Sequence, residues 1–308
     1  MTERYSQLAH WGAFTAVVEN GRFVAAEPFA GDPHPSPMLQ AMPAMVYSPS
    51  RITRPVVRES WLKRRLKDGR GHDRFVEVTW DFALDLVAEE IDRVRAERGG
   101  DGILGGSYGW SSAGRFHHSR TQLKRYLFAG GGCVDQQGNY SWGSAQFFLP
   151  HVVGSFESVS GKVTHWTSNV EHTQLFLGIG GLPLKNTQVG SGGIGRHEHQ
   201  DYLAAMHRRG CRFVMVTPVR QDAPAFVQAE WIPIRPNTDT AMLLAMMQVL
   251  IADDAHDKAF LARYCVGFER LADYLTGRTD GVAKTPAWAE AICGVPAATI
   301  ARLARELP

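Results

Sequence analysis

Short apolar runs alternate with longer amphipathic stretches through most of the chain, a pattern that predicts strands alternating with helices. Residues 79–98 carry apolar side chains at helical spacing, from Phe82 to Val94, behind Thr79 as a capping residue, so we expect a helix there. The remaining predicted elements are strands over 103–104, 174–177, 212–216 and 231–234, helices over 113–128, 199–208 and 240–251, and only helices after residue 257. Because the strands are short, apolar and unalternating, helices should cover both of their faces. We therefore predict an α/β fold with doubly wound, mostly parallel sheets in two α/β units.

The first part of the chain departs from this pattern. Residues 14–19 have the composition of a strand, but the segment from Pro28 to Pro43 contains five prolines and is expected to be an extended or turning connection. Regular structure is expected to begin near Phe75. The predicted organisation is a small, irregular, β-rich N-terminal region (1–58), a first α/β unit (59–160) and a second, dinucleotide-binding-like α/β unit (161–308).

Composition and charge narrow the class of protein. The chain has 308 residues, of which 44% are hydrophobic and 21% charged, and a net charge of +2. These values are ordinary for a globular protein and give no electrostatic case for nucleic acid as a partner. The one dense basic run, from Lys63 to Arg70, is expected to be a solvated loop. No apolar run is long enough to span a membrane, and the first residues resemble no secretion signal, so we expect a cytoplasmic protein.

The four cysteines, Cys133, Cys211, Cys265 and Cys293, lie far apart in the sequence. Structural zinc sites and iron–sulfur clusters need closely spaced thiolates, so neither is expected within this chain. Isolated cysteines in apolar surroundings also argue against a disulfide framework.

Open α/β sheets bind ligands beyond the carboxyl ends of their strands, and the loop after residues 103–104 carries suitable residues. Gly105 and Gly106 let a ligand approach the backbone closely. Tyr108 and Trp110 offer an O–H and an N–H donor on large apolar rings. Taken alone, the same two aromatics fit better as core residues that flank a turn.

A second candidate, Ser141, lies further along the chain among Gly138, Asn139, Tyr140 and Trp142. A serine in such a segment is usually a turn residue that hydrogen-bonds its own backbone. In isolation, that is the better interpretation of the segment.

Seven short motifs nevertheless follow one another along essentially the whole chain. They are AHWG at 9–12, SYGW at 107–110, YSWGSAQ at 140–146, PHVVG at 150–154, PLKNT at 183–187, TPVR at 217–220 and RPNTD at 235–239. Each motif is weak alone, but the ordered set is specific. In this order they resemble the dimethyl sulfoxide reductase family of molybdopterin oxidoreductases, in the branch of the dimethyl sulfoxide, trimethylamine N-oxide and biotin sulfoxide reductases.

The resemblance implies a bis(molybdopterin guanine dinucleotide) cofactor, with Ser141 as the protein ligand to molybdenum and no iron–sulfur cluster. A serine alkoxide is a hard oxygen donor suited to a high-valent metal; Cys133 is a rival ligand. The resemblance also implies that Tyr108 and Trp110 face the metal and the oxygen of a small S-oxide or N-oxide substrate, with Ser111 as a cofactor contact. An electron donor is the implied partner.

By the same resemblance, the guanine-nucleotide ends of the cofactor lie on the second α/β unit. Lys185 pairs with phosphate, and Asp239 accepts hydrogen bonds from guanine, caps the helix over 240–251, or does both. Thr217 and Trp142 depart from the family pattern, which usually has Asp and often Thr at these positions. The implied cofactor contacts are Trp110, Ser111, Lys185, Asn186, Thr187, Thr217, Pro218, Arg220, Asn237 and Asp239.

Three other interpretations stay open. The sequence from Gly190 to Gly195 fits the G-x-G-x-x-G fingerprint of a nicotinamide dehydrogenase, although it lies about a dozen residues from the preceding predicted strand. His197, Glu198 and His199 are metal-binding residue types, but their spacing favours an ordinary helix start. The chain is also much shorter than full-length family members, which is compatible with a truncated or split, non-catalytic fragment that lacks a C-terminal portion.

Overall fold

The computed structural model describes residues 1–65, 69–107, 118–138, 140–160, 164–190 and 193–307. The chain divides into two compact units. Unit 1 comprises Met1–Val163 and Gln188–His197, and unit 2 comprises Thr164–Thr187 and Glu198–Pro308. The chain therefore leaves unit 2 after Thr187, contributes one short segment to unit 1, and returns at Glu198.

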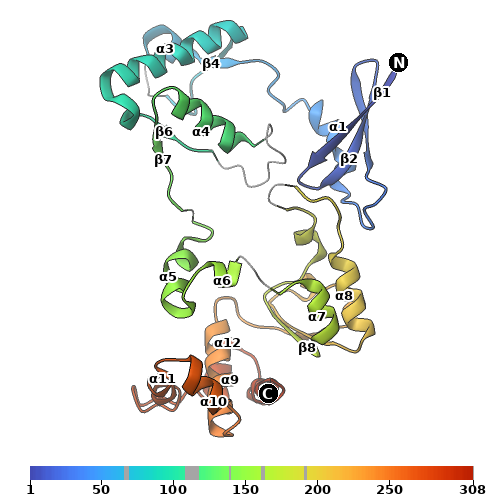
Figure 1. Ribbon diagram of the computed structural model, residues 1–308, viewed down its shortest axis with the longest axis vertical. Coiled ribbons are helices and arrows are strands. Elements are labelled where there is room, and N and C mark those ends of the chain that lie inside the picture. Colours follow the sequence, from blue (N-terminus) through green and yellow to red (C-terminus); the bar gives the residue numbers. More distant parts are fainter. Residues whose placement is uncertain (66–68, 108–117, 139, 161–163, 191–192, 308) are drawn as a thin grey trace. The chain divides into compact units, whose positions relative to one another are not determined.

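Unit 1 begins with an antiparallel sheet, which is followed by small strand pairs and helices (Figure 1). Its strands are β1 (Thr2–Ala9), β2 (Gly12–Glu19), β3 (Arg22–Pro28), β4 (Val56–Arg58), β5 (Phe75–Glu77), β6 (Leu104–Gly105) and β7 (Val134–Asp135). Its helices are α1 (Met38–Val46), α2 (Glu59–Arg64), α3 (Trp80–Arg98), α4 (Ser119–Ala129), α5 (Gly143–Val153) and α6 (Glu157–Ser160), with the 3-10 turn η1 (Gly99–Gly102). The strands β1, β2 and β3 form a meander, β4 pairs antiparallel with β5, and β6 pairs parallel with β7.

The N-terminal sheet corrects the expectation that regular structure begins near Phe75. Phe14 and Ala26 on this sheet pack with Leu39 of α1 and form a small core. Helix α1 also corrects the expectation of an extended connection up to Pro43, because Pro43 lies inside this helix. A proline inside a helix removes one backbone hydrogen bond, and the burial of Leu39 against the sheet offsets that loss.

Helix α3 confirms the prediction for residues 79–98. The Oγ1 atom of Thr79 accepts a hydrogen bond from the backbone N–H of Phe82 at 3.3 Å, which satisfies one of the free donors at the start of the helix. Leu86 is buried, whereas Leu84 is more than half exposed. The described part of unit 1 therefore covers only a narrow stripe of this helix.

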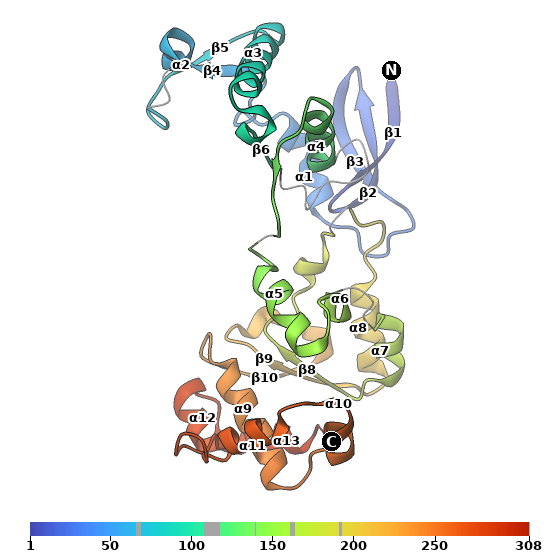
Figure 2. The ribbon, with the colours of Figure 1, turned by 60° about the vertical axis from the view of Figure 1, so that its left-hand side comes forward.

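Unit 2 is built on a parallel sheet with the strand order β10-β9-β8 (Figure 2). Its strands are β8 (Leu175–Ile179), β9 (Arg212–Val216) and β10 (Glu230–Ile232). Its helices are α7 (Trp166–His172), α8 (His199–Arg208), α9 (Asp239–Ala252), α10 (Lys258–Tyr264), α11 (Phe268–Leu275), α12 (Pro286–Cys293) and α13 (Ala297–Arg305), with the 3-10 turns η2 (Leu184–Thr187), η3 (Arg220–Asp222) and η4 (Ala225–Val227). The predictions for β8, β9, β10, α8 and α9 are confirmed to within two residues at each end, as is the helical character after residue 257. The helix predicted over 113–128 is described from Ser119, and residues 113–117 lie outside the described residues.

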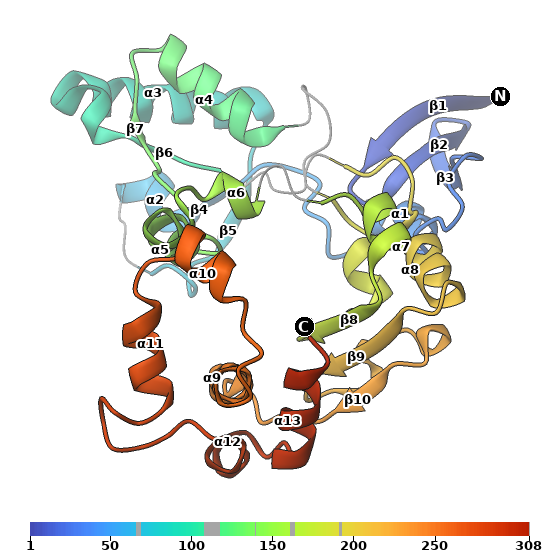
Figure 3. The same ribbon diagram turned by 60° about the horizontal axis from the view of Figure 1, so that its bottom comes forward.

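Alternate residues of β9 face opposite sides of the sheet and pack into two different hydrophobic cores. Phe213 packs with Leu203 and Met206 of α8, while Val214 and Val216 pack with residues of α9, α12 and α13. Figure 3 shows α8 on one side of the sheet and α9, α12 and α13 on the other. Helices thus cover both faces of a parallel sheet, which confirms the α/β class. Among the described helices, none is both long and apolar enough to cross a lipid bilayer.

Candidate functional site

The carboxyl ends of the three parallel strands of unit 2 lie side by side. Ile179 at the end of β8 pairs with Val216 at the end of β9, which pairs with Ile232 at the end of β10. The chain segments that follow these residues therefore leave the sheet at one edge, where α/β sheets bind ligands. Each of the three motifs expected to contact the nucleotide follows one of these strand ends.

The first segment places Lys185 and Asn186 on the exposed turn η2. The backbone N–H of Asn186 donates to the carbonyl oxygen of Pro183 at 3.0 Å. The hydroxyl of Thr187 donates to the carbonyl oxygen of Leu184 at 2.8 Å. These bonds hold the turn closed and leave the Lys185 ammonium exposed, where it can pair with a phosphate as a point charge.

The second segment is held together by Thr217, whose side chain is buried. Its hydroxyl donates to Oδ2 of Asp222 at 3.1 Å and accepts the backbone N–H of Val219 at 3.3 Å. Its carbonyl oxygen accepts a hydrogen bond from Nε1 of Trp231 at 2.9 Å. Thr217 is therefore engaged in building the loop, and Asp222 supplies a carboxylate five residues further on.

Asp222 also joins the first two segments. Its carbonyl oxygen accepts the backbone N–H of Leu182 at 2.7 Å, and a Cβ on Gly181 would come within about 3.0 Å of the Asp222 carboxyl carbon. Neither Asp222 nor Trp231 was expected at this site from the sequence. A tryptophan in a predicted strand and an aspartate in a predicted loop carry no local signal that would have singled them out.

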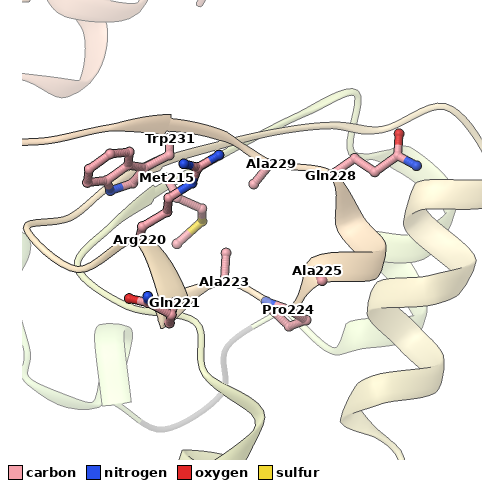
Figure 4. A pocket seen from close by; sticks show the side chains of 9 residues that line it. All are labelled: Met215, Arg220, Gln221, Ala223, Pro224, Ala225, Gln228, Ala229 and Trp231. Atoms are coloured by element: carbon pink, nitrogen blue, oxygen red, sulfur yellow. The ribbon is translucent and has the colours of Figure 1, made fainter.

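A cavity of about 750 Å³ lies beside this loop, on the face of the sheet that carries Met215 (Figure 4). Arg220 and Trp231 line one end of the cavity, and the guanidinium carbon of Arg220 lies 5.8 Å from the centre of the Trp231 ring. Gln228 lies at the other end. The cavity therefore offers a cation, an aromatic surface and an amide to a ligand. Its lining residues are Met215, Arg220, Gln221, Ala223, Pro224, Ala225, Gln228, Ala229 and Trp231.

The third segment ends in the first turn of α9. The cap residue is Thr238, whose hydroxyl donates to the carbonyl oxygen of Arg235 at 2.6 Å and makes no side-chain cap. Asp239 is the first residue of the helix, which corrects the expectation that it caps the helix; at this position its negative charge interacts favourably with the helix dipole. Asn237, which is exposed, has a φ of +64°, a conformation that asparagine tolerates better than most residues.

The expected metal ligand lies in unit 1. Ser141 is exposed in the turn before α5, next to a fully exposed Tyr140. Trp142 caps α5, and its ring packs edge-on against Phe156 with 5.4 Å between the ring centres. The rival ligand Cys133 lies against β6, since a Cβ on Gly105 would come within 2.6 Å of its sulfur.

Three of the predicted site residues, Tyr108, Trp110 and Ser111, lie outside the described residues. Among the described residues, Ser141 lies in the turn before α5, and the three motifs that were expected to contact a nucleotide lie after the strand ends of the unit 2 sheet.

The histidine-rich segment confirms the expectation of an ordinary helix start. His199 is the first residue of α8, and its ring packs edge-on against Trp166 at 4.5 Å. Burial lowers the pKa of the His199 imidazole. His197 instead forms a buried hydrogen-bonded pair with Asp32, with 2.6 Å between Nδ1 and Oδ2, a contact that no local pattern indicates because the two residues are far apart in the chain.

The glycine-rich sequence does not have the setting of a dinucleotide fingerprint. The motif runs from Gly190 to Gly195. Strand β8 ends at Ile179, well before the motif, and helix α8 begins only at His199. The fingerprint needs the glycines to join a strand directly to a helix. Here the glycines belong to a segment of unit 1.

By its fold, the chain is an α/β protein with polar loops gathered at the carboxyl edge of a parallel sheet. Residues 51–300 match the family model described as molybdopterin oxidoreductase, and residues 7–47 match that of the molybdopterin oxidoreductase N-terminal domain. The chain belongs to the molybdopterin oxidoreductase family.

Several relatives are similar over almost the whole chain. A dimethyl sulfoxide/trimethylamine N-oxide reductase from Rhodobacter capsulatus is 43% identical over 96% of this chain and 36% of its own length. A biotin sulfoxide reductase from Cereibacter sphaeroides is 42% identical over 92% of this chain and 39% of its own length. Trimethylamine-N-oxide reductase 1 from Escherichia coli is 39% identical over 97% of this chain and 36% of its own length. The chain thus spans well under half the length of these relatives.

A solved structure, acetylene hydratase from Pelobacter acetylenicus, is similar with a TM-score of 0.55 and 20% identity over 97% of this chain and 38% of that one. At this identity the similarity supports the fold alone.

Proposed function

We propose that this chain is the N-terminal, cofactor-binding part of an enzyme that reduces small S-oxides or N-oxides with a molybdenum–molybdopterin cofactor. The observation that carries the proposal is the 42–43% identity to reductases named for these substrates, over more than nine-tenths of the chain. The polar loops at one edge of the unit 2 sheet support it, because a dinucleotide-type cofactor needs such an edge.

The finer proposal is the bis(molybdopterin guanine dinucleotide) form of the cofactor. The residues at the sheet edge fit its nucleotide ends: Lys185 and Arg220 supply cations for phosphate, and Asp239 supplies a carboxylate for the N–H edge of guanine. The nearby cavity of about 750 Å³ has the size of a small-molecule site. Asn186, Thr187, Thr217, Pro218 and Asn237 complete the proposed contacts.

Ser141 is the proposed protein ligand to molybdenum. Its turn is exposed, so the hydroxyl is accessible, and a deprotonated serine is a hard donor. Within the described ranges, no group of three or more His, Cys, Asp or Glu side chains is arranged to hold a metal ion, so the cofactor itself has to bring the other ligands. When bound, the cofactor supplies the oxygen-atom transfer chemistry. The spacing of the four cysteines keeps an iron–sulfur cluster out of the proposal.

Tyr108 and Trp110 are proposed to donate hydrogen bonds to the oxygen of the oxide. Negative charge builds on this oxygen as its bond to sulfur or nitrogen breaks. Fixed donors in a site that excludes water stabilise such charge, and each is typically worth about 3 kcal/mol of barrier. Ser111, the next residue after Trp110, is a proposed cofactor contact.

The test is the cofactor content of the complete protein. We expect about one molybdenum and two guanine nucleotides per chain, released on denaturation, and dye-linked reduction of an S-oxide or N-oxide. A complete protein that holds neither molybdenum nor guanine nucleotide and reduces neither class of oxide would overturn the proposal.

A second candidate function is that of a non-catalytic cofactor-domain fragment or split subunit. It is favoured by large exposed apolar side chains in unit 1: Trp80 of α3 is 67% exposed, and Phe147 and Phe148 of α5 are 77% and 61% exposed. Such surface usually marks a contact with another chain or segment. We expect the 308-residue chain alone to associate and to show no turnover. A monodisperse monomer with stoichiometric molybdenum and normal turnover would contradict this.

The remaining expectations stay predictions. They are a cytoplasmic location, a separate electron donor, a C-terminal portion as partner, and the division at residues 1–58, 59–160 and 161–308. The doubly wound arrangement is likewise proposed, and the helices on both faces of the unit 2 sheet support it.

A further inference from the structure

A buried pair of side chains in unit 1, Asp32 and His197, joins two segments that lie far apart in the sequence. The Nδ1 atom of His197 lies 2.6 Å from Oδ2 of Asp32, and the backbone N–H of His197 donates to Oδ1 of the same carboxylate at 2.9 Å. The two side chains are 3% and 0% exposed. The cofactor contacts proposed above do not include this pair, so its burial needs a separate explanation.

The hydrogen-bond partners determine how many protons the His197 imidazole carries. Its Nε2 atom lies 3.0 Å from the main-chain carbonyl oxygen of Gln188, and because a carbonyl can only accept, Nε2 carries a proton. Burial on its own raises the pKa of Asp32, but hydrogen bonds from His197 and from the backbone of His34 outweigh burial and lower this pKa below its ordinary value. Oδ1 of Asp32 accepts the backbone N–H groups of His197 and His34, so the carboxylate is placed as an acceptor, and a proton on Nδ1 completes its hydrogen bonds. With a proton on each nitrogen the ring is an imidazolium.

The same imidazole closes a glycine-rich loop at its base. The loop is the segment Gln188–His197, which belongs to unit 1 although the chain on both sides of it belongs to unit 2. The contact between Nε2 of His197 and the Gln188 carbonyl joins the two ends of the loop, and the N–H of Gly193 donates to the carbonyl of Gly190 at 3.0 Å within it. One ring therefore holds the loop closed and, through Asp32, holds it on the N-terminal sheet.

The place where the ring packs is shaped by Gly12 at the start of β2. Gly12 has a φ of +133°, and a Cβ there would lie 3.3 Å from Cε1 of His197 and 3.7 Å from Oδ2 of Asp32. It would also lie 3.8 Å from Leu39 of α1. A larger residue at this position would therefore both strain the backbone and crowd the pair.

The contacts of the ring require both of its protons. A neutral imidazole has only one N–H. It therefore either loses the hydrogen bond to the Gln188 carbonyl or turns a lone pair toward the Asp32 carboxylate. Either change leaves a buried polar group without a partner, which is costly. Around the pair, β2 and α1 contribute Gly12 and Leu39, and α1 contains no charged residue. The titratable groups next to the pair along the chain are His34, Arg196 and Glu198.

We propose that Asp32 and His197 form a proton-dependent latch that fixes the Gln188–His197 loop on the N-terminal sheet. The loop directly follows η2, which carries the Lys185, Asn186 and Thr187 contacts. On the proposed function, to which this role is tied, the latch fixes the stretch of chain that comes directly after the proposed cofactor contacts. Asp32 and His197 are thus positioning residues, and a ring with a single N–H keeps only one of its two side-chain contacts, with Asp32 or with the Gln188 carbonyl.

The first test is the nitrogen spectrum of the His197 ring in the unmodified full chain, labelled with 15N-histidine. We expect the chemical shifts of two protonated ring nitrogens at neutral pH, assigned by their loss in His197→Gln. A neutral tautomer, with one protonated and one unprotonated nitrogen, would overturn the proposal. The spectrum itself is recorded on the unmodified chain, and the variant is used only to assign the signals.

The second test is amide hydrogen exchange in residues 188–190 and 193–197. In Asp32→Asn we expect protection of these amides to fall by about tenfold or more, as for the loss of a hydrogen bond to a charged group. In the unmodified chain we expect protection to fall as the pH is raised, once corrected for intrinsic exchange, and in Asp32→Asn this pH dependence should disappear.

The matched control is His172→Gln. His172 forms an exposed pair with Glu171 at 3.6 Å, with side chains 78% and 65% exposed, and its loss should leave exchange in the loop unchanged. Equal protection in Asp32→Asn and in the control would overturn the latch. Neither test uses the cofactor, so a failure of the latch and a failure of the proposed function are read separately.

Discussion

The carboxyl edge of the unit 2 sheet and the Ser141 turn of unit 1 are built very differently. At the sheet edge, Thr217 is buried and its hydroxyl and carbonyl oxygen have three hydrogen-bond partners, Asp222, Val219 and Trp231. In the Ser141 turn, Tyr140 is fully exposed. The residues proposed for the nucleotide thus lie on loops held by their own hydrogen bonds, while the proposed metal ligand lies in an exposed turn.

This difference bears on how the cofactor would be held. A loop that is already hydrogen-bonded and buried loses little freedom when a ligand binds, so its contacts contribute most of their energy to affinity. We therefore expect nucleotide contacts to govern retention of the cofactor and the Ser141 turn to govern chemistry.

The largest expected effect is that of Ser141→Ala in the complete, cofactor-loaded protein. Loss of the proposed ligand should abolish oxide reduction while leaving the guanine-nucleotide content near normal, measured by turnover and by nucleotide release. Ser144→Ala, an exposed serine on α5, is the matched control and should retain activity. A Ser141→Ala protein with normal turnover and an unchanged metal spectrum would remove Ser141 from its role.

Tyr108→Phe should have a smaller effect. If the phenol is a positioned donor, its loss should slow oxide reduction by roughly 10²-fold or less, with molybdenum still bound. Steady-state kinetics and metal analysis of the complete protein measure both quantities. Loss of the metal or of the fold in Tyr108→Phe would instead make Tyr108 a core residue.

Arg220→Ala tests the proposed nucleotide contacts at the edge of the unit 2 sheet. Removal of this cation from the cavity should weaken retention of guanine nucleotide by roughly tenfold, as for a charge-assisted contact, and should alter turnover per bound cofactor little. Arg263→Ala is a suitable control, since Arg263 is also exposed and lies 5.1 Å from the ring centre of Tyr264 in the same unit. Equal nucleotide loss in both variants would argue against a specific role for Arg220.

The smallest expected effect concerns Asp32, whose side chain is fully buried in unit 1, in contrast to the exposed Ser141 turn. Because the pKa of Asp32 is lowered in the folded chain, its contribution to stability is complete above the ordinary carboxyl value of about 3.9 and is lost as the pH falls through the lower folded value. The difference in urea midpoint between the unmodified chain and Asp32→Asn should therefore narrow as the pH is lowered from about 6 to about 3. A difference that stays constant over this range would exclude an ionised Asp32 as its source.

Several elements were predictable because their signals are local. Helix α3 has its cap at Thr79 and its apolar spacing within one stretch of sequence, and β9 is a short apolar run between polar neighbours. The ordered motifs led to the family because each is a continuous string of residues. The one helix in the N-terminal region, α1, was missed for the converse reason, since the packing of Leu39 on a sheet outweighs the local signal of Pro43.

The tertiary structure decided the contacts that depend on residues far apart in the chain. No local pattern connects Thr217 with Trp231, or Asp32 with His197, because each pair meets only after strands and loops have been brought together. A hydrogen bond between distant residues depends on the folded positions of their backbones, whereas helix caps and apolar periodicity depend on neighbours a few residues away. For this reason the sequence was sufficient for the α/β class and the family, and the loop architecture at the sheet edge and the buried Asp32–His197 pair became visible only in the folded chain.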